Sequence, residues 1–125
     1  MVGSKLQQLQ YESDTWKRLF GFMLDENVHL KHRLAEILKD GFNRNLLEDM
    51  ESFQSRIIKE DDRIGLLRHD VVEFDKLLTR EIFEDGRVMA QVSSKIHRLR
   101  NNVRNAEDQF NKLKVEFNSY LLENI

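Results

Sequence analysis

The fold is decided by residues 89–120, MAQVSSKIHRLRNNVRNAEDQFNKLKVEFNSY, in which an apolar or aromatic side chain recurs every three or four positions. This spacing places those side chains on one face of an α-helix, because a helical turn takes about 3.6 residues. A repeat near 3.5 is typical of helices that pack in coiled-coil fashion. We call these positions the seam of the segment; they are Met89, Val92, Ile96, Leu99, Val103, Ala106, Phe110, Leu113, Phe117 and Tyr120.

Two earlier segments carry seams of the same kind. The first seam consists of Leu6, Leu9, Ser13, Trp16, Phe20, Met23, Asn27, Leu30, Leu34 and Ile37. The second consists of Leu46, Met50, Phe53, Ile57, Glu60, Ile64, Leu67, Val71, Phe74, Leu78 and Glu81. Three stripes with one period predict three helices that cross at shallow angles around a shared core.

Two glycines separate the three segments. Gly41 and Gly86 each follow acidic residues where the period breaks, and glycine readily takes the left-handed conformation that ends a helix. We therefore predict helices over about 4–40, 44–85 and 87–122, with Ser4 capping the first and Asn43 or Asn45 capping the second.

Short turns make neighbouring helices antiparallel. The predicted fold is all-α, a single domain over residues 1–125 that forms an elongated antiparallel three-helix bundle with coiled-coil-like packing. The termini should lie at opposite ends. Residues level with each other in the first and second helices should have numbers adding to about 85, and in the second and third helices to about 172. Phe42 and Phe83, beside the turns, should cap the ends of the core or mediate end-to-end contacts.

Composition agrees with this fold and limits the function. The 125 residues include no proline and no cysteine, and 34% are charged, as expected for helices with solvated outer faces. The net charge of −2 gives no overall attraction to nucleic acid. No apolar run approaches the roughly 20 residues that cross a bilayer, so we expect no membrane contact and a cytoplasmic location.

Polar residues interrupt two seams. Asn27 and Glu60 fall at nearly the same height of the predicted bundle, opposite Phe110 and Leu113. Buried polar residues at such positions fix helix alignment at a cost in stability. We interpret the pair as a polar alignment layer; the alternative is that Glu60 marks a gap that admits a ligand.

A row of small and apolar residues runs outside the seams of the first two helices. Glycine inside a helix costs about 1 kcal/mol relative to alanine, so outward glycines need a reason. The row forms either a groove for another helix or a widened core stripe. It consists of Gly21, Val28, Ala35, Ile58, Gly65, Leu66 and Val72.

Charge is distributed unevenly along the chain. Residues 41–85 hold 7 basic and 12 acidic side chains, whereas residues 86–125 hold 7 basic and 4 acidic ones. The stretch 95–104 is the place where nucleic-acid binding would be expected, through Arg98, Arg100 and Arg104. No aromatic residue is interleaved there for stacking on bases.

Four histidines raise the question of a metal. Glu26 and His29 match the Glu-x-x-His pattern of di-metal carboxylate bundles, but no second copy of the pattern exists. The predicted register separates His29 from His69 by about 20 Å, too far for shared coordination. We therefore expect neither a metal, a cofactor nor catalytic residues.

The sequence thus predicts a non-enzymatic interaction or scaffold module that acts through its helix faces. A protein partner or a second copy of the chain is the expected ligand, so a homo-oligomer is predicted. A nucleic-acid-associated protein that uses residues 95–104 is the first alternative, and a di-metal carboxylate enzyme is the second.

Overall fold

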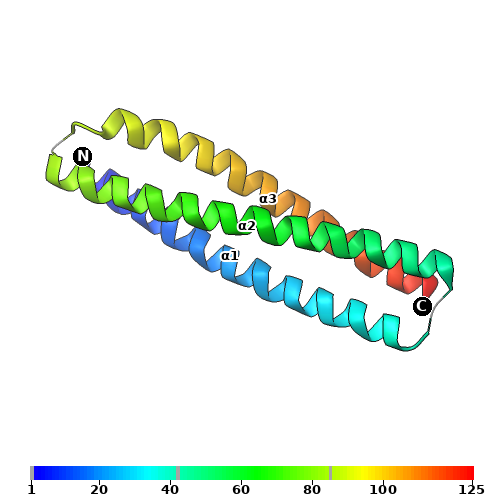
Figure 1. Ribbon diagram of the computed structural model, residues 1–125. Helices are drawn as coiled ribbons and strands as arrows, with labels where there is room; N and C mark the ends of the chain where they lie inside the picture. Colours follow the sequence, from blue (N-terminus) through cyan, green and yellow to red (C-terminus); the bar gives the residue numbers. More distant parts are fainter. Residues whose placement is uncertain (1, 42, 85) are drawn as a thin grey trace.

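The computed structural model describes residues 2–41, 43–84 and 86–125 and confirms the all-helical bundle. Its three helices are α1 (Val2–Lys39), α2 (Arg44–Glu84) and α3 (Met89–Asn124). They run antiparallel in chain order, and the two termini lie at opposite ends of the rod, as predicted (Figure 1). The longest helix, with 41 residues, is about 60 Å long at ~1.5 Å per residue.

Both turns form as the glycines predict. Gly41 and Gly86 have φ angles of 92° and 91°, in the left-handed region that side chains with a Cβ rarely adopt. Of the two candidate caps for α2, Asn43 takes the role: its Oδ1 accepts a hydrogen bond of 2.8 Å from the backbone N–H of Leu46.

Two helix starts differ from the prediction. Helix α1 already begins at Val2, so Ser4 lies inside the helix and does not cap it. Helix α3 begins at Met89 rather than at residue 87, because the chain first forms a turn in which the N–H of Met89 donates to the carbonyl of Gly86 at 3.3 Å. This turn buries Val88, a core residue that lies outside the predicted seams.

The core follows the three seams closely. Every predicted seam residue is buried or half-buried, and the side chains of Phe20, Phe74 and Phe117 are fully enclosed. Trp16 is 8% exposed, in keeping with its seam position. Burial of this stripe from water is the main force that holds the helices together.

The apolar core is divided into two clusters along the rod. One contains Phe20, Met23 and Ile64 and extends to the Gly86 end, and the other contains Leu30 and Ile57 and extends to the Gly41 end. Asn27 and Glu60, which are 0% and 6% exposed, lie in the seams between the two clusters. The predicted polar layer therefore coincides with a real division of the core.

Contacts between helices confirm the predicted register. Arg56 pairs with Glu116 and Phe53 packs edge-on against Phe117, so contacting residues of α2 and α3 have numbers adding to 172 and 170. Between α1 and α2 the corresponding value is 88 for Asn27 and Asp61. This sum exceeds the predicted value of 85 by about three residues, which is less than one helical turn.

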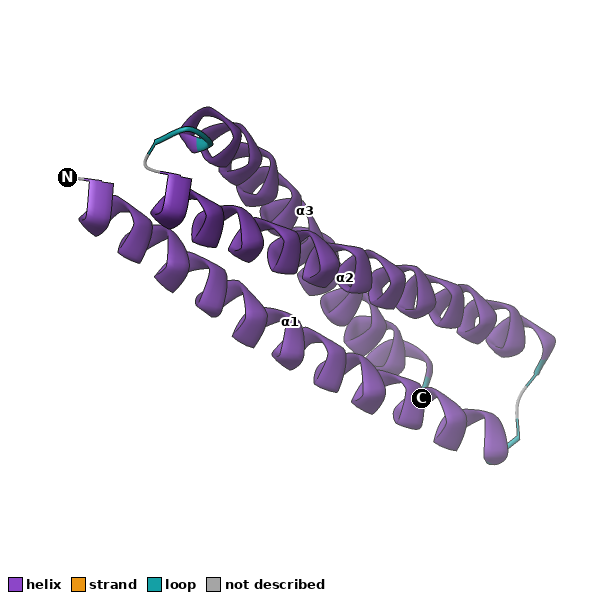
Figure 2. Ribbon diagram, turned by 60° about the vertical axis from the view of Figure 1, so that its left-hand side comes forward, coloured by secondary structure: helices purple, strands orange, loops and turns teal. Residues whose placement is uncertain are grey.

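Helix α2 is the central element of the bundle. Its backbone packs closely against both neighbours, whereas the backbones of α1 and α3 come close to each other at far fewer positions. Figure 2 shows this difference, because α3 crosses behind α2 and diverges from α1 at the end where α1 begins. No helix in the described part of the chain is long and apolar enough to cross a membrane.

One of the two alternatives for the turn phenylalanines is wrong for Phe83. This side chain is 82% exposed and therefore does not cap the core. The other alternative, an end-to-end contact through Phe83, stays a prediction. Phe42 lies outside the described residues.

The two classes of glycine should respond to alanine with opposite signs. A Cβ at Gly41 or at Gly65 would meet nothing within 4 Å, so backbone conformation alone decides the effect. We expect Gly41→Ala to lower the free energy of unfolding by about 1 kcal/mol, because it forces a left-handed alanine. Gly65→Ala should raise it by up to about 1 kcal/mol. Urea unfolding followed by circular dichroism in dilute solution measures both, and shifts of the same sign would contradict the assignment.

Candidate functional site

A polar cluster joins α1 to α2 near the Gly86 end of the rod. Ser13, which is fully buried in the α1 seam, donates a hydrogen bond of 2.6 Å from Oγ to Oδ1 of Asp75. The other carboxylate oxygen of Asp75 pairs with Lys17. Hydrogen bonding to Asp75, partly opposed by burial, raises the pKa of Lys17 above its usual value.

The same arrangement recurs two heptads further along α1. Asn27 donates from Nδ2 to Oδ1 of Asp61 at 2.8 Å, and Lys31 pairs with Oδ2 of the same aspartate. In each cluster an aspartate of α2 binds two side chains of α1. One is a buried polar residue of the seam, and the other is the lysine four residues after it in α1. We call these two clusters the polar clamps.

The boundary between α1 and α3 carries two ion pairs with the same spacing. Arg100 makes two hydrogen bonds of 2.8 Å to the carboxylate of Glu12, and Lys114 lies 3.1 Å from Glu26. The α1 residues of these ion pairs and of the clamps all lie in two six-residue segments, ESDTWK at residues 12–17 and ENVHLK at residues 26–31. The two segments are versions of one motif, with a glutamate first, a buried polar residue second and a lysine last. Our sequence analysis missed this repeat, although comparing α1 with itself at a 14-residue shift would have found it.

Glu60 is the least favourably placed member of the polar layer. Burial, which outweighs the opposing effects of Arg63 and Arg56, raises the pKa of its carboxyl group above the usual range. One carboxylate oxygen of Glu60 and the amide oxygen of Asn27 accept no hydrogen bond from a described residue. Glu60 lines a hollow of about 120 Å³ between α2 and α3, so a small gap does exist beside it.

Six residues of the predicted outer row lie beside the polar clamps. Each is one helical turn, three or four residues, from a clamp residue, which places it along the boundary of α1 and α2. All six are exposed, with Val28, Ile58 and Val72 at 46%, 48% and 47%. The row is therefore an outer surface and not a widened core stripe. We call it the α1–α2 face; it consists of Gly21, Val28, Ala35, Ile58, Gly65 and Val72.

Leu66 does not belong to this face. It is 69% exposed and lines a hollow between α2 and α3 together with Asn102 and Asn105. Adjacent residues on a helix point about 100° apart, so Gly65 and Leu66 face different neighbours.

The three arginines of the predicted basic patch do not share one surface. Arg98 lines a hollow between α2 and α3, whereas Arg100 and Arg104 line a hollow between α1 and α3. Arg100 is already engaged by Glu12, and this hydrogen bonding raises its pKa. A basic stretch that is continuous in sequence is thus divided between two grooves.

The four histidines lie on the surface of the bundle. His29, His32, His69 and His97 are all exposed. In the described part of the chain, no group of three or more histidine, aspartate or glutamate side chains is arranged to hold a metal ion.

Glu81 is a buried carboxylate to which the sequence analysis gave no role. It is 2% exposed, and neither of its oxygens accepts a hydrogen bond from a described residue. The signal that singled out Glu60, an acidic residue in an apolar seam, was present here too.

No protein-family model, no curated protein and no solved structure matches this chain. The functional argument therefore depends on the geometry of its surfaces.

The clamps predict a sharp difference between two adjacent aspartates. Asp61→Ala should lower the free energy of unfolding by about 1 to 3 kcal/mol, because it leaves the buried amide of Asn27 without its partner. Asp62→Ala, which removes an exposed carboxylate, should change it by less than about 0.5 kcal/mol. Chemical denaturation of the two variants checks this, and equal losses would show that Asp61 does not act through Asn27.

Proposed function

We propose that this protein is a non-enzymatic, cytoplasmic interaction or scaffold module that binds a second copy of itself through the α1–α2 face. The observation that carries the proposal is the exposure of six small and apolar residues, spaced seven residues apart along each of two adjacent helices. A Cβ placed on Gly21 or Gly65 would meet nothing within 4 Å, so both positions leave room for another backbone to approach.

The charges of this face also suit self-association. Each polar clamp contributes one lysine and one aspartate, Lys17 with Asp75 and Lys31 with Asp61. The two clamp pairs therefore add no net charge beside the face, although Lys17 also lies 3.7 Å from Asp14. Two copies can meet there without the cost of opposing like charges, as an isologous contact between identical patches requires.

The non-enzymatic part of the proposal is supported by the regularity of the core. The seams fill the space between the helices, and the described histidines project outward rather than into an enclosed site. Acid–base catalysis would need a titratable group that is held beside a sheltered substrate. The nucleic-acid alternative is not favoured by any specific arrangement of Arg98, Arg100 and Arg104.

The oligomeric state tests the proposal. Light scattering over a range of concentrations should show the wild type passing from monomer to dimer, and Gly65→Glu should weaken this association at least tenfold, or about 1.4 kcal/mol. The matched control is Asn101→Glu, which adds the same charge at an exposed position on α3 and should leave the dimer intact. A wild type that stays monomeric, with no effect of Gly65→Glu, would rule out self-association. Binding of a different protein by the same face would survive that result.

A further inference from the structure

A second surface, on the opposite side of α2, has a different chemical character. Four hollows follow one another between α2 and α3, and each shares lining residues with the next. Counted from the Gly86 end, the first and second hollows share Lys95 and Arg98. The second and third share Asp70 and Asn102, and the third and fourth share Arg63. The four hollows therefore form one elongated groove, which we call the α2–α3 groove.

The groove is basic although the chain is acidic. Its lining includes seven lysines and arginines and three acidic residues, a balance of +4 against −2 for the whole protein. Glu73 and Lys76 pair with each other at 3.1 Å, and Arg56 is already paired with Glu116. Burial raises the pKa of another of these acids, Glu60, while Arg63 and Arg56 oppose this effect.

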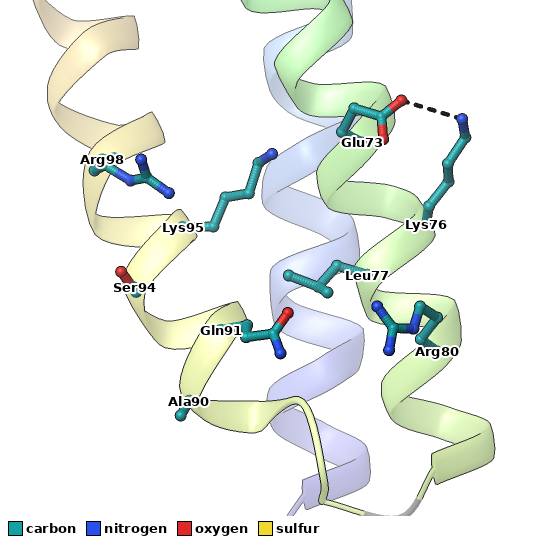
Figure 3. A pocket seen from close by; sticks show the side chains of 9 residues that line it. All are labelled: Glu73, Lys76, Leu77, Arg80, Ala90, Gln91, Ser94, Lys95 and Arg98. Atoms are coloured by element: carbon teal, nitrogen blue, oxygen red, sulfur yellow. Dashed lines mark hydrogen bonds and ion pairs between the residues drawn. The ribbon is translucent and has the colours of Figure 1, made fainter.

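Cationic side chains are concentrated at both ends of the groove. At the Gly86 end, in a hollow of about 640 Å³, Lys95 and Arg98 extend from α3 towards α2, and Leu77 and Arg80 extend from α2 towards α3 (Figure 3). Lys95 and Arg98 form no ion pair with a described residue. At the other end Arg56, Lys59 and Arg63 line the small hollow beside Glu60.

Between these ends the groove is partly apolar. Leu66, at 69% exposure, supplies most of this apolar surface, and the half-buried Leu77 adds to it at the Gly86 end. Leu67 and Leu99 are buried, at 4% and 2% exposure, and form the floor of the groove. The distance along α2 from Arg56 to Arg80 is about 36 Å, or ~24 residues of helix. A ligand that uses the whole groove must therefore be long, apolar on one side and acidic at its edges.

We propose that the α2–α3 groove binds an amphipathic helix of a partner protein. The apolar stripe of that helix packs on Leu66 and Leu77, and its acidic residues pair with Lys95 and Arg98 at one end of the groove and with Lys59 and Arg63 at the other. A compact phosphate ligand fits less well, because the two basic groups are too far apart for it to contact both. A nucleic-acid strand fits less well because no aromatic side chain lines these hollows for base stacking. The proposal does not depend on self-association through the α1–α2 face.

A designed peptide tests the groove directly. The probe is a labelled peptide of about 24 residues with a leucine seam and glutamates on both flanks, whose own charges oppose self-pairing. Fluorescence anisotropy at ~50 mM salt, where screening is weak, should show that it binds the full-length protein. Lys95→Glu combined with Arg98→Glu should weaken binding at least tenfold, or about 1.4 kcal/mol.

Two controls separate this site from general charge effects. Lys5→Glu combined with Arg104→Glu makes the same change in net charge at exposed positions outside the groove, and it should alter peptide affinity by less than about twofold. Gly65→Glu should bind the peptide like the wild type, whatever its oligomeric state. Circular dichroism confirms that each variant is folded.

Three results would overturn the proposal. The first is no binding of the peptide at about 100 µM protein, a concentration at which even weak complexes form. The second is an equal loss of affinity in the two charge-reversal variants. The third is binding of a single-stranded oligothymidylate or of tripolyphosphate as tight as that of the peptide, which would assign the groove to nucleic acid or to small polyanions.

Discussion

Two buried polar side chains on α1, Ser13 and Asn27, need acceptors for their hydrogen-bond donors, and the aspartates of α2 that accept these bonds hold α1 and α2 in one alignment. An apolar seam alone tolerates a shift by a whole heptad, because every heptad offers similar side chains. Buried polar groups do not tolerate such a shift, because it would leave each of them without its hydrogen-bond partner at a cost of about 1 to 3 kcal/mol. The ion pairs of Glu12 and Glu26 with α3 repeat this spacing, so one motif of α1 contacts both neighbours.

The alignment determines what remains on the outside. Since each clamp occupies the edge of a seam, the positions one turn away from it, such as Gly21 and Gly65, form the outer surface between α1 and α2. The other side of α2 carries the α2–α3 groove, which is basic at its ends and lined by Leu66 in its middle. Helix α2 thus separates a surface of small and apolar residues from a positively charged groove.

The spacing of apolar residues was sufficient to predict the three helices, the turns at Gly41 and Gly86, and the height of Asn27 and Glu60. The spacing was not sufficient to predict which pair of helices a residue outside the seam lies between. Arg98 and Arg100 are neighbours in sequence but point about 200° apart, so they line different grooves. Asp61 and Asp75 were missed for the same reason, because their role depends on which edge of α2 meets α1.

The central claim is that the α1–α2 face is open in the monomer and covered by a second copy. Because the chain has no cysteine, Val28→Cys and Ile58→Cys each introduce a single thiol on this face, with Asn101→Cys on α3 as the reference. The most direct measurement is the rate of thiol labelling as a function of protein concentration. The account predicts labelling as fast as the reference in dilute protein, and protection of the first two thiols as the concentration rises. Slow labelling in the monomer, or rates unchanged in a formed dimer, would contradict it.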